Sequence, residues 1–365
     1  MDLIMLLAVA WYSIVRFGVS VMNSFFPSFL PHHTEEGDLP TLSLCIPIRN
    51  EESRLASFFH DLTNSGFSGP VLFCDDNSTD SSLQLLQEFA QNRPNVAVFS
   101  SPPLPPLHFG KPMACATLSP HITTQYALFM DVDVRIKPQA FRDLIDAASN
   151  DQSDLLSVFP FQRFRFLGEE LVVPLMFHLL LSHLPLRWIT HQKWWRFAAA
   201  NGQVLLFRTE FLQKHHLWNK VTSEIIEDIK VAQWTKRLGG KTTLYFSDPR
   251  ISTFMYQGSA EARQGFSKNI THLLGGYFGA FAHLTTALIF PIALCFSHFW
   301  WWNIVFFVLG WISFMINLNR KTALVPFQSW VYYPFYLIHF YRTLFFSLWN
   351  TTRKTNTWKN RIMPG

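Results

Sequence analysis

Hydrophobic and polar positions divide the 365-residue chain into three zones. Residues 3–15 are apolar and uncharged, and the chain stays mostly apolar to Leu30, with Arg16 as the first interruption. A membrane span needs about 20 apolar residues, so residues 1–30 fit an N-terminal membrane anchor if Arg16 extends towards an interface. A cleaved signal peptide fits less well, because the run lacks a basic leading region and a small-residue cleavage site.

The C-terminal zone, residues 266–365, is the most apolar part of the chain. Between Thr271 and Asn350 the charged residues are Arg320, Lys321 and Arg342. Apolar runs rich in Trp, Phe and Tyr lie near residues 272–297, 299–317 and 329–349. We therefore expect an interfacial helix, transmembrane segments and a basic tail in this zone.

The middle zone, residues 39–265, alternates short apolar runs with amphipathic segments. Helices are expected from Glu52 and from Asp80, and strands are expected at residues 42–48, 71–76, 96–100 and 127–133. Strands that alternate with helices predict crossover units and a largely parallel sheet.

One segment of the middle zone, residues 171–189, is apolar but interrupted by Pro174, His178, His183 and Pro185. We interpret it as an interfacial helix that lines the entry of a lipid. Packing in an ordinary core is the alternative.

Two acidic clusters follow predicted strands: CDDNSTD (74–80) and MDVDV (130–134). Ligands in such sheets bind outside the carboxyl ends of the strands. In an extended strand Asp131 and Asp133 point to the same side, where two carboxylates repel. Mg²⁺ or Mn²⁺ relieves this repulsion and binds substrate phosphates, so the pair predicts a metal and diphosphate site.

Two other interpretations of Asp131 and Asp133 stay open. In the first, the carboxylates are merely solvated or cap the next helix. In the second, Asp131 is the nucleophile of a phosphatase of the haloacid dehalogenase type. The phosphatase motif belongs on the opening strand of its sheet, whereas at least two strand-like runs precede Asp131.

Composition narrows the class of protein. Hydrophobic residues make up 49% of the chain and charged residues 15%, against roughly 25% charged residues in soluble domains. The net charge of +5 is not concentrated in a dense basic stripe, so we do not expect a nucleic-acid partner. We expect the protein to lie against a membrane surface instead. The four cysteines form no CxxC pair, which indicates neither a disulfide framework nor a zinc site.

The order of the motifs resembles that of a known family. IPIRNEESRL (46–55), CDDNSTD, MDVDV and IIEDIKVA (225–232) follow one another as in family 2 glycosyltransferases with the GT-A fold. Residues 105–118, 198–208 and 255–269 resemble the membrane-bound branch, which includes carotenoid-acid glucosyltransferases of the diaponeurosporenoate type and hopanoid-associated enzymes. The resemblance implies an α/β fold: a Rossmann-like mixed sheet with N- and C-terminal transmembrane helices.

The resemblance also implies donor-binding residues. Pro47 and Glu51 would face the nucleoside, and Asp75 or Asp76 would bond the uracil or the ribose. The other interpretation of residues 76–80 is a turn and helix cap. Lys111 would contact the diphosphate together with Asp131, although His108 and Phe109 replace the Gly-Trp usual in the branch.

The family's general base matches Asp228, which would take the proton of the acceptor. A placed base typically accelerates such a step 10²–10⁴-fold. The alternative role for Glu227 and Asp228 is to complement the N-terminal charge of a helix. Asn201, Gly202 and Glu227 are expected on the acceptor side.

A last motif of the family departs from the usual pattern. Related enzymes carry Q/R-x-x-R-W where this chain has Arg263 and Phe266. The resemblance implies a contact of Arg263 with the diphosphate, and Lys268 is the other candidate.

These observations predict an inverting, membrane-bound glycosyltransferase with a Mg²⁺ or Mn²⁺ cofactor. It would move glucose from UDP-glucose, or a similar nucleotide sugar, to a polyisoprenoid lipid such as a carotenoid acid. We expect a multi-pass protein of the cell membrane with a cytoplasmic catalytic domain. Three full spans after that domain would leave the basic tail outside, so residues 329–349 are expected to be re-entrant or interfacial.

Two alternatives belong to other classes. A processive polysaccharide synthase would need more spans and a complete Q-x-x-R-W motif. A transporter would favour acidic residues within the membrane, and residues 271–350 contain none, while a non-catalytic scaffold is not excluded.

Overall fold

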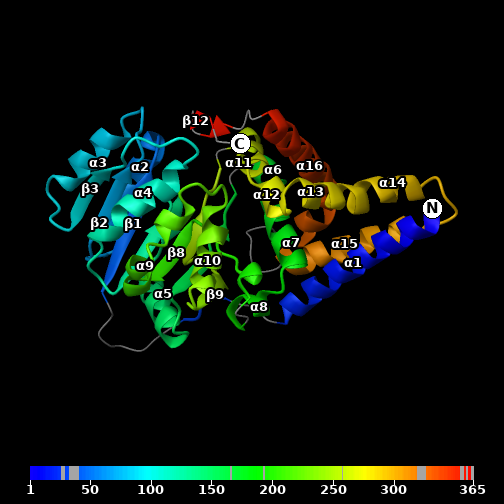
Figure 1. Cartoon of the computed structure of the whole chain (residues 1–365), viewed down its shortest axis with the longest axis horizontal. Helices are drawn as coiled ribbons and strands as arrows, with labels where there is room; N and C mark the ends of the chain where they lie inside the picture. Colours follow the sequence, from blue (N-terminus) through cyan, green and yellow to red (C-terminus); the bar gives the residue numbers. More distant parts are fainter. Residues whose placement is uncertain are drawn as a thin grey trace.

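The computed structural model describes residues 1–25, 29–32, 41–164, 167–191, 194–256, 258–318, 326–353, 357–358 and 361–362. An α/β domain lies beside a group of long apolar helices (Figure 1). The domain is built on a mixed sheet of seven strands in the order β3-β2-β1-β4-β8-β6-β9. Its strands are β1 (Leu42–Ile48), β2 (Val71–Asp75), β3 (Val96–Ser100), β4 (Tyr126–Met130), β6 (Leu155–Phe159), β8 (Val204–Arg208) and β9 (Thr242–Phe246).

The sheet is predominantly parallel, as predicted. Strands β3, β2, β1 and β4 pair in parallel, and so do β6 and β9, whereas β8 runs antiparallel to both β4 and β6. A second sheet lies beside it, formed by β5 (Val134–Ile136), β10 (Ile251–Thr253) and β7 (Phe161–Gln162).

One strand boundary was predicted wrongly. Strand β4 ends at Met130, so Asp131 and Asp133 lie in a turn and not in the strand. The backbone N–H of Val134 donates to the carbonyl of Asp131 at 3.1 Å and closes that turn. The argument from alternating strand faces therefore does not apply to the two aspartates.

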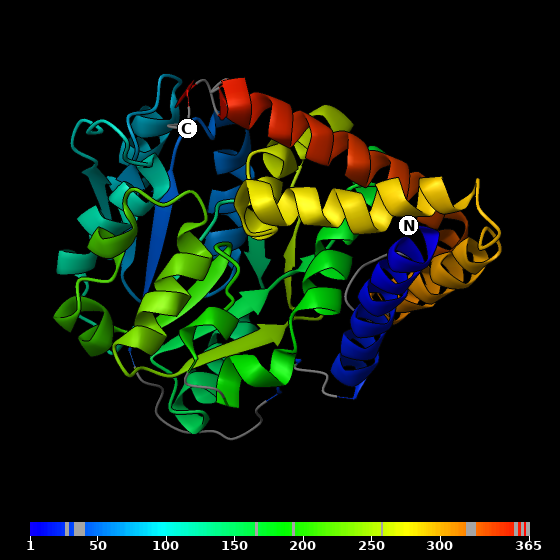
Figure 2. The same cartoon turned by 45° about the vertical axis from the view of Figure 1, so that its right-hand side comes forward.

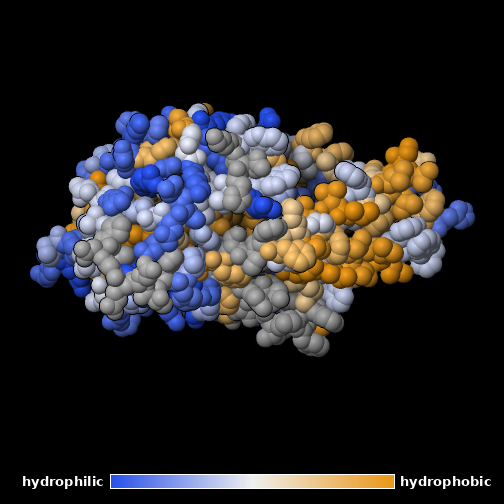
Figure 3. All heavy atoms as spheres, turned by 90° about the horizontal axis from the view of Figure 1, so that it is seen from below, coloured by the Kyte–Doolittle hydropathy of each residue, from blue (hydrophilic) through white to orange (hydrophobic). Residues whose placement is uncertain are grey.

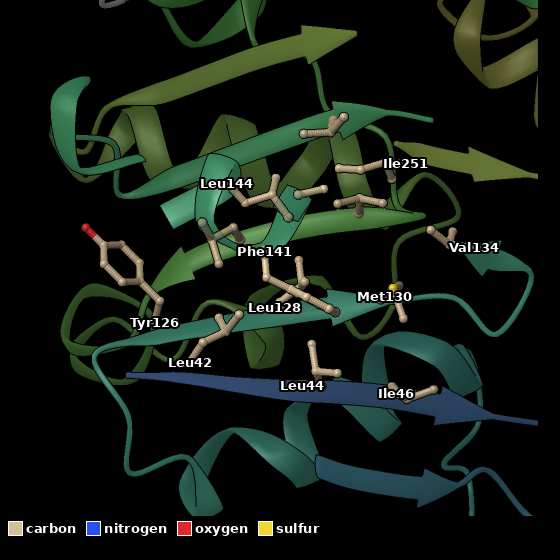
Figure 4. Close-up of a cluster of buried hydrophobic side chains, with 14 of the residues drawn as sticks. Leu42, Leu44, Ile46, Tyr126, Leu128, Met130, Val134, Phe141, Leu144 and Ile251 are labelled. Atoms are coloured by element: carbon tan, nitrogen blue, oxygen red, sulfur yellow. The ribbon is translucent and has the colours of Figure 1, made fainter. Parts of the chain in front are cut away.

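Alternating side chains of the strands build a core on each face of the sheet. Leu44, Leu128 and Leu206 pack on one face beneath α2 (Glu52–Asn64), α3 (Ser82–Ala90) and α5 (Pro138–Asn150). Figure 4 shows how Phe141 and Leu144 of α5 meet this face. The other face is covered by α4 (Gly110–Leu118), α9 (Thr209–Lys214), α10 (Glu227–Arg237) and the 3₁₀ turns at Ser119–His121 and Trp218–Val221.

A third core joins the domain to the apolar helices. Phe159 and Phe246, at the ends of β6 and β9, contact Phe177 of α7 (Val173–His183). The same cluster includes side chains of α11 (Ser259–Ser267), α12 (Ile270–Leu273), α13 (Gly276–Leu284), α15 (Trp302–Leu318) and α16 (Pro326–Arg353). Segment 171–189 thus buries one side of α7 in a core, and Pro185 separates α7 from α8 (Leu186–His191).

The apolar helices form an arm that points away from the domain (Figures 1 and 2). Helix α1 (Asp2–Ser24), the segment Gly276–Leu294 and α15 converge near the N-terminus. Segment Gly276–Leu294 consists of α13, a π-helical turn (Thr285–Ile289) and α14 (Phe290–Leu294). Helix α16 crosses the base of the arm and ends near the domain.

Two described helices are long and apolar enough to cross a bilayer, namely Asp2–Ser24 and Gly276–Leu294. Helix α15 is apolar but shorter. The remaining elements are α6 (Leu167–Glu170), the 3₁₀ turn Trp195–Phe197, and the short pair β11 (Thr357–Trp358) and β12 (Arg361–Ile362).

Candidate active site

A cavity of about 760 Å³ lies at the carboxyl ends of β1 and β4. It collects most of the residues that the sequence analysis selected from distant segments. Its polar wall contains Pro47, Glu51, Asp76, Lys111, Asp131, Asp133, Asn201, Gly202, Glu227 and Asp228. The predicted donor side and acceptor side therefore share one cavity.

Asp131 and Asp133 lie in the turn after β4. Gln203 donates from its Nε2 to Oδ2 of Asp133 at 3.3 Å, whereas Oδ1 of Asp133 is buried without a hydrogen-bond partner. Burial, reinforced by the negative charge of Asp131, raises the pKa of Asp133 to about 7. A cation beside the free Oδ1 would stabilise the ionised form of Asp133.

Lys111 lies in the first turn of α4 and points into the carboxylate group. Its Nζ lies 2.7 Å from Oδ1 of Asp131 and 3.8 Å from Oε1 of Glu227, and donates to the carbonyl of Gly202 at 2.9 Å. Burial would lower the pKa of Lys111, but Asp131 and Glu227 outweigh it and raise that pKa. Lys111 is therefore a permanent cation at the centre of the site.

Asp228 is the second residue of α10 and is held by backbone donors. Its Oδ2 accepts from the N–H of Gly202 at 2.9 Å, and its Oδ1 accepts from its neighbour Ile229 at 2.8 Å. Burial raises the pKa of Asp228, and likewise that of Glu227, above the usual range of carboxyl groups. Asp228 is thus a fixed carboxylate with raised basicity.

Gly202 permits this close arrangement. A Cβ at this position would lie 3.2 Å from Nζ of Lys111 and 3.4 Å from Oδ2 of Asp228. Asn201 turns its Oδ1 to the backbone N–H of Gln203 at 2.8 Å and stabilises the loop before β8. The loop brings Lys111 and Asp228 together on either side of one glycine.

Asp131 and Asp133 fit a divalent cation. They offer carboxylate oxygens, one of them without a partner, and the cavity wall has more carboxylates than lysines and arginines. Mg²⁺ and Mn²⁺ commonly take one or two carboxylates and complete their shell with substrate phosphates and water. Among the described residues no group of three His, Cys, Asp or Glu side chains is placed to hold a metal by itself.

Arg54 and Gln203 are functional candidates that the sequence analysis missed. Arg54 lines the cavity and bonds Oε2 of Glu51 at 3.0 Å and Oε1 of Glu261 at 3.2 Å. The i, i+3 spacing of Glu51 and Arg54 was the one signal available. For Gln203, which holds Asp133, no local signal existed.

Two selected residues are not among the described residues that line the cavity. Asp75 is buried behind it, where its Oδ2 accepts from the N–H of Ser78 at 3.1 Å. Arg263 lies on α11, where its positive charge acts on His339 of α16. Lys268, the alternative to Arg263, does line the cavity.

One side of the cavity wall is predominantly apolar. It is formed by α7 together with the segment from α11 to the loop before α13, and includes Leu179, Leu180, Leu184, Phe266, Leu273 and Leu274. The polar carboxylate group and this apolar wall belong to the same hollow.

Comparison with known proteins identifies the family of this domain. Residues 43–212 match the model of glycosyl transferase family 2. The matched part of the domain belongs to this family. The matched residues include Lys111, Asp131 and Asp133 of the cavity. The chain is a glycosyltransferase, as the motif order predicted.

Two proteins resemble this glycosyltransferase over most of its length. The chain is 24% identical over 264 residues to the 4,4'-diaponeurosporenoate glycosyltransferase of Staphylococcus haemolyticus, covering 71% of this chain and 68% of the relative. A mannosyltransferase from Pyrobaculum calidifontis, solved with GDP-mannose and Mn²⁺, superposes with a TM-score of 0.57 at 12% identity, covering 95% and 99% of the two chains. The predicted GT-A fold is thereby confirmed.

Proposed function

We propose that this family 2 glycosyltransferase transfers glucose from UDP-glucose, or a closely similar donor, to a membrane lipid, with inversion at the anomeric carbon. The observation that carries the proposal is the single cavity, polar at the strand ends and apolar along α7. A nucleotide sugar suits the first part and a lipid chain the second.

We assign some residues of the cavity to the donor and others to the acceptor. Pro47, Glu51 and Asp76 would hold the nucleoside, and Lys111 would neutralise the diphosphate as it leaves. Asp131 and Asp133 would hold Mg²⁺ or Mn²⁺, which supplies charge stabilisation for the leaving group when bound. The Pyrobaculum enzyme was solved with Mn²⁺, which supports this assignment.

Asp228 would accept the proton of an acceptor hydroxyl. The backbone N–H groups of Gly202 and Ile229 fix the orientation of its carboxylate before the acceptor arrives. Fixed orientation and a raised pKa both favour proton abstraction near neutral pH. Asn201 and Glu227 would border the acceptor on this side.

The lipid acceptor is proposed from two observations. The Staphylococcus relative is named for a carotenoid acid, and the apolar helices carry an exposed hydrophobic surface that Figure 3 shows on the arm. Exposed apolar side chains lie on α1, the Gly276–Leu294 segment, α15 and α16, including Trp11, Phe278, Phe281, Ile304 and Ile338. A surface of this kind is covered in membrane proteins by lipid.

Mass spectrometry of lipids from cells with and without the gene tests this proposal. We expect one lipid class to gain a hexose only in the presence of the gene. The control is the Asp228→Asn variant expressed at the same level. Identical lipid profiles with and without the wild-type gene would contradict the proposal.

A further inference from the structure

A polar cluster lies behind the apolar wall of the cavity, where α1, α7 and α13 meet. We call it the Arg16 cluster, and it comprises Tyr12, Arg16, His178, Ser182, His183 and His283. Four of these side chains are basic or imidazole groups, and none is acidic. The proposed catalytic steps use none of them.

The sequence analysis expected Arg16 to extend towards a membrane interface, but its guanidinium contacts side chains of α1 and α7 instead. Its Nε and Nη2 donate to Oγ of Ser182 at 3.0 and 2.8 Å, and its Nη2 lies 2.9 Å from Nε2 of His178. Its Nη1 donates to the hydroxyl of Tyr12 at 3.3 Å. These partners are hydroxyl groups and an imidazole, and within the described part of the chain no carboxylate pairs with Arg16.

The cluster reaches the cavity through His183. The hydroxyl of Tyr12 lies 2.6 Å from Nδ1 of His283 and 3.4 Å from Nε2 of His183. His178, Ser182 and His283 are buried, whereas His183 is exposed and forms part of the cavity wall. An imidazole thus connects the half-buried guanidinium to the cavity wall formed by Leu180 and Leu184.

A guanidinium without a counter-ion is expensive in apolar surroundings, and ionisable groups at such places commonly mark binding sites. The guanidinium fork matches the oxygens of carboxylate and phosphate groups. His183 adds a polar group in the cavity wall, and the hydroxyl of Tyr12 lies beside it. An anionic ligand would supply the missing charge.

We propose that the Arg16 cluster binds the anionic group of a lipid, a phosphate or a carboxylate, whose chain lies along the apolar wall of the cavity. This inference rests on the proposed function in one respect, namely that a lipid occupies the cavity. Two sources fit this chemistry: the headgroup of a phospholipid and the acid group of the acceptor itself.

Binding to the full-length protein in a neutral detergent tests the site. The probes are dodecyl phosphate, dodecanoate and uncharged dodecanol, titrated by calorimetry. We expect at least one anion to bind more tightly than dodecanol, and Arg16→Gln to weaken that anion about 10- to 100-fold. Dodecanol binding should not change, and the stronger anion identifies the phosphate or the carboxylate source.

Two further variants make the result decisive. His183→Gln removes the imidazole from an exposed position and should weaken the same anion less than Arg16→Gln does. The control Arg342→Gln removes a charge from an exposed position on α16 and should leave all affinities unchanged. Equal binding of the anions by wild type, Arg16→Gln and His183→Gln would overturn the proposal, and so would equal binding of anions and dodecanol by wild type.

The experiment separates this site from the proposed function. Asp228→Asn should bind the anions as the wild type does, because Asp228 has no contact with the Arg16 cluster. Anion binding without sugar transfer to any lipid would refute the proposed function alone. Sugar transfer to a lipid without anion binding would refute the Arg16 site alone.

Discussion

At the scale of single residues, the site is organised around Lys111. One ammonium group contacts Asp131, Glu227 and the carbonyl of Gly202. It therefore links the turn after β4, the start of α10 and the loop before β8. Two carboxylates and one carbonyl, from three distant segments, meet at this one side chain.

Replacing Asp228 with Asn separates a base from a helix cap. Asn keeps the shape and still caps helices, but it lacks a basic oxygen. Turnover with a hydroxyl acceptor should fall about 10²–10⁴-fold, while donor affinity stays unchanged. Sugar transfer from a labelled donor to extracted lipid measures turnover, and calorimetry measures donor affinity.

The pH profile gives the same residue a second test. Burial raises the pKa of Asp228, and a base acts only when deprotonated, so activity should be lost as pH falls through a value above the ordinary aspartate pKa of about 3.9. Asp146→Asn, on the opposite side of the sheet, is the control and should retain full activity. Wild-type turnover by the Asp228→Asn variant would exclude Asp228 as the general base.

Asp131→Asn and Asp133→Asn test the cation site. Each substitution removes one carboxylate charge while keeping the side-chain shape. Donor binding should lose its dependence on Mn²⁺ in both variants, and EDTA should reduce wild-type binding to the same level. Calorimetric titration of the donor with Mn²⁺ and with EDTA measures this; an unchanged Mn²⁺ effect in both variants would rule out these ligands.

Local sequence predicted those parts of the site whose residues are neighbours. Asp131, Asp133, Glu227 and Asp228 are visible as motifs because an apolar run or a helix start precedes them. The pair Asp75 and Asp76 shows the limit: adjacent in sequence, one is buried behind the cavity and the other lines it. Which of them faces the ligand depends on the packing around β2.

At the scale of elements, the ion pairs of Arg54 connect α2 to α11. Sequence reasoning missed this link because Glu261 lies 207 positions from Arg54. The same limit applies to β8, whose antiparallel direction depends on its partners β4 and β6. The strands β1, β2 and β3 were predictable because each is an apolar run ended by a polar turn.

Arg54→Met should loosen α11 against the domain. The half-exposed pair with Glu261 contributes up to about 1 kcal/mol, and its loss leaves Glu51 without its i, i+3 partner. Hydrogen exchange should become faster in α11 and remain unchanged in α5. Equal protection of α11 in both proteins would show that the ion pair does not hold this helix.

At the scale of the whole molecule, the arm suggests a topology. If Asp2–Ser24 and Gly276–Leu294 cross the membrane and α15 returns, the end of α16 and strand β12 lie on the side of the domain, consistent with Figure 1. This arrangement satisfies the positive-inside rule for the basic tail. It also agrees with the expectation that residues 329–349 are interfacial.

Reporter fusions test that topology. Reporters at Glu36, which lies outside the described residues, near Leu318 and after Arg353 should all be cytoplasmic. A reporter at Ser297, between α14 and α15, should be external. An external signal at Glu36 would place the domain away from cytosolic nucleotide sugars and would require a lipid-linked donor.

The shared cavity has a consequence for how the rate should depend on concentration. On the proposed function, the donor is dissolved in a volume, whereas the acceptor is spread over an area and enters along α7. Adding inert lipid then dilutes the acceptor without diluting the donor. Turnover should follow the mole fraction of acceptor in the bilayer, and at a fixed mole fraction should be insensitive to the total amount of membrane.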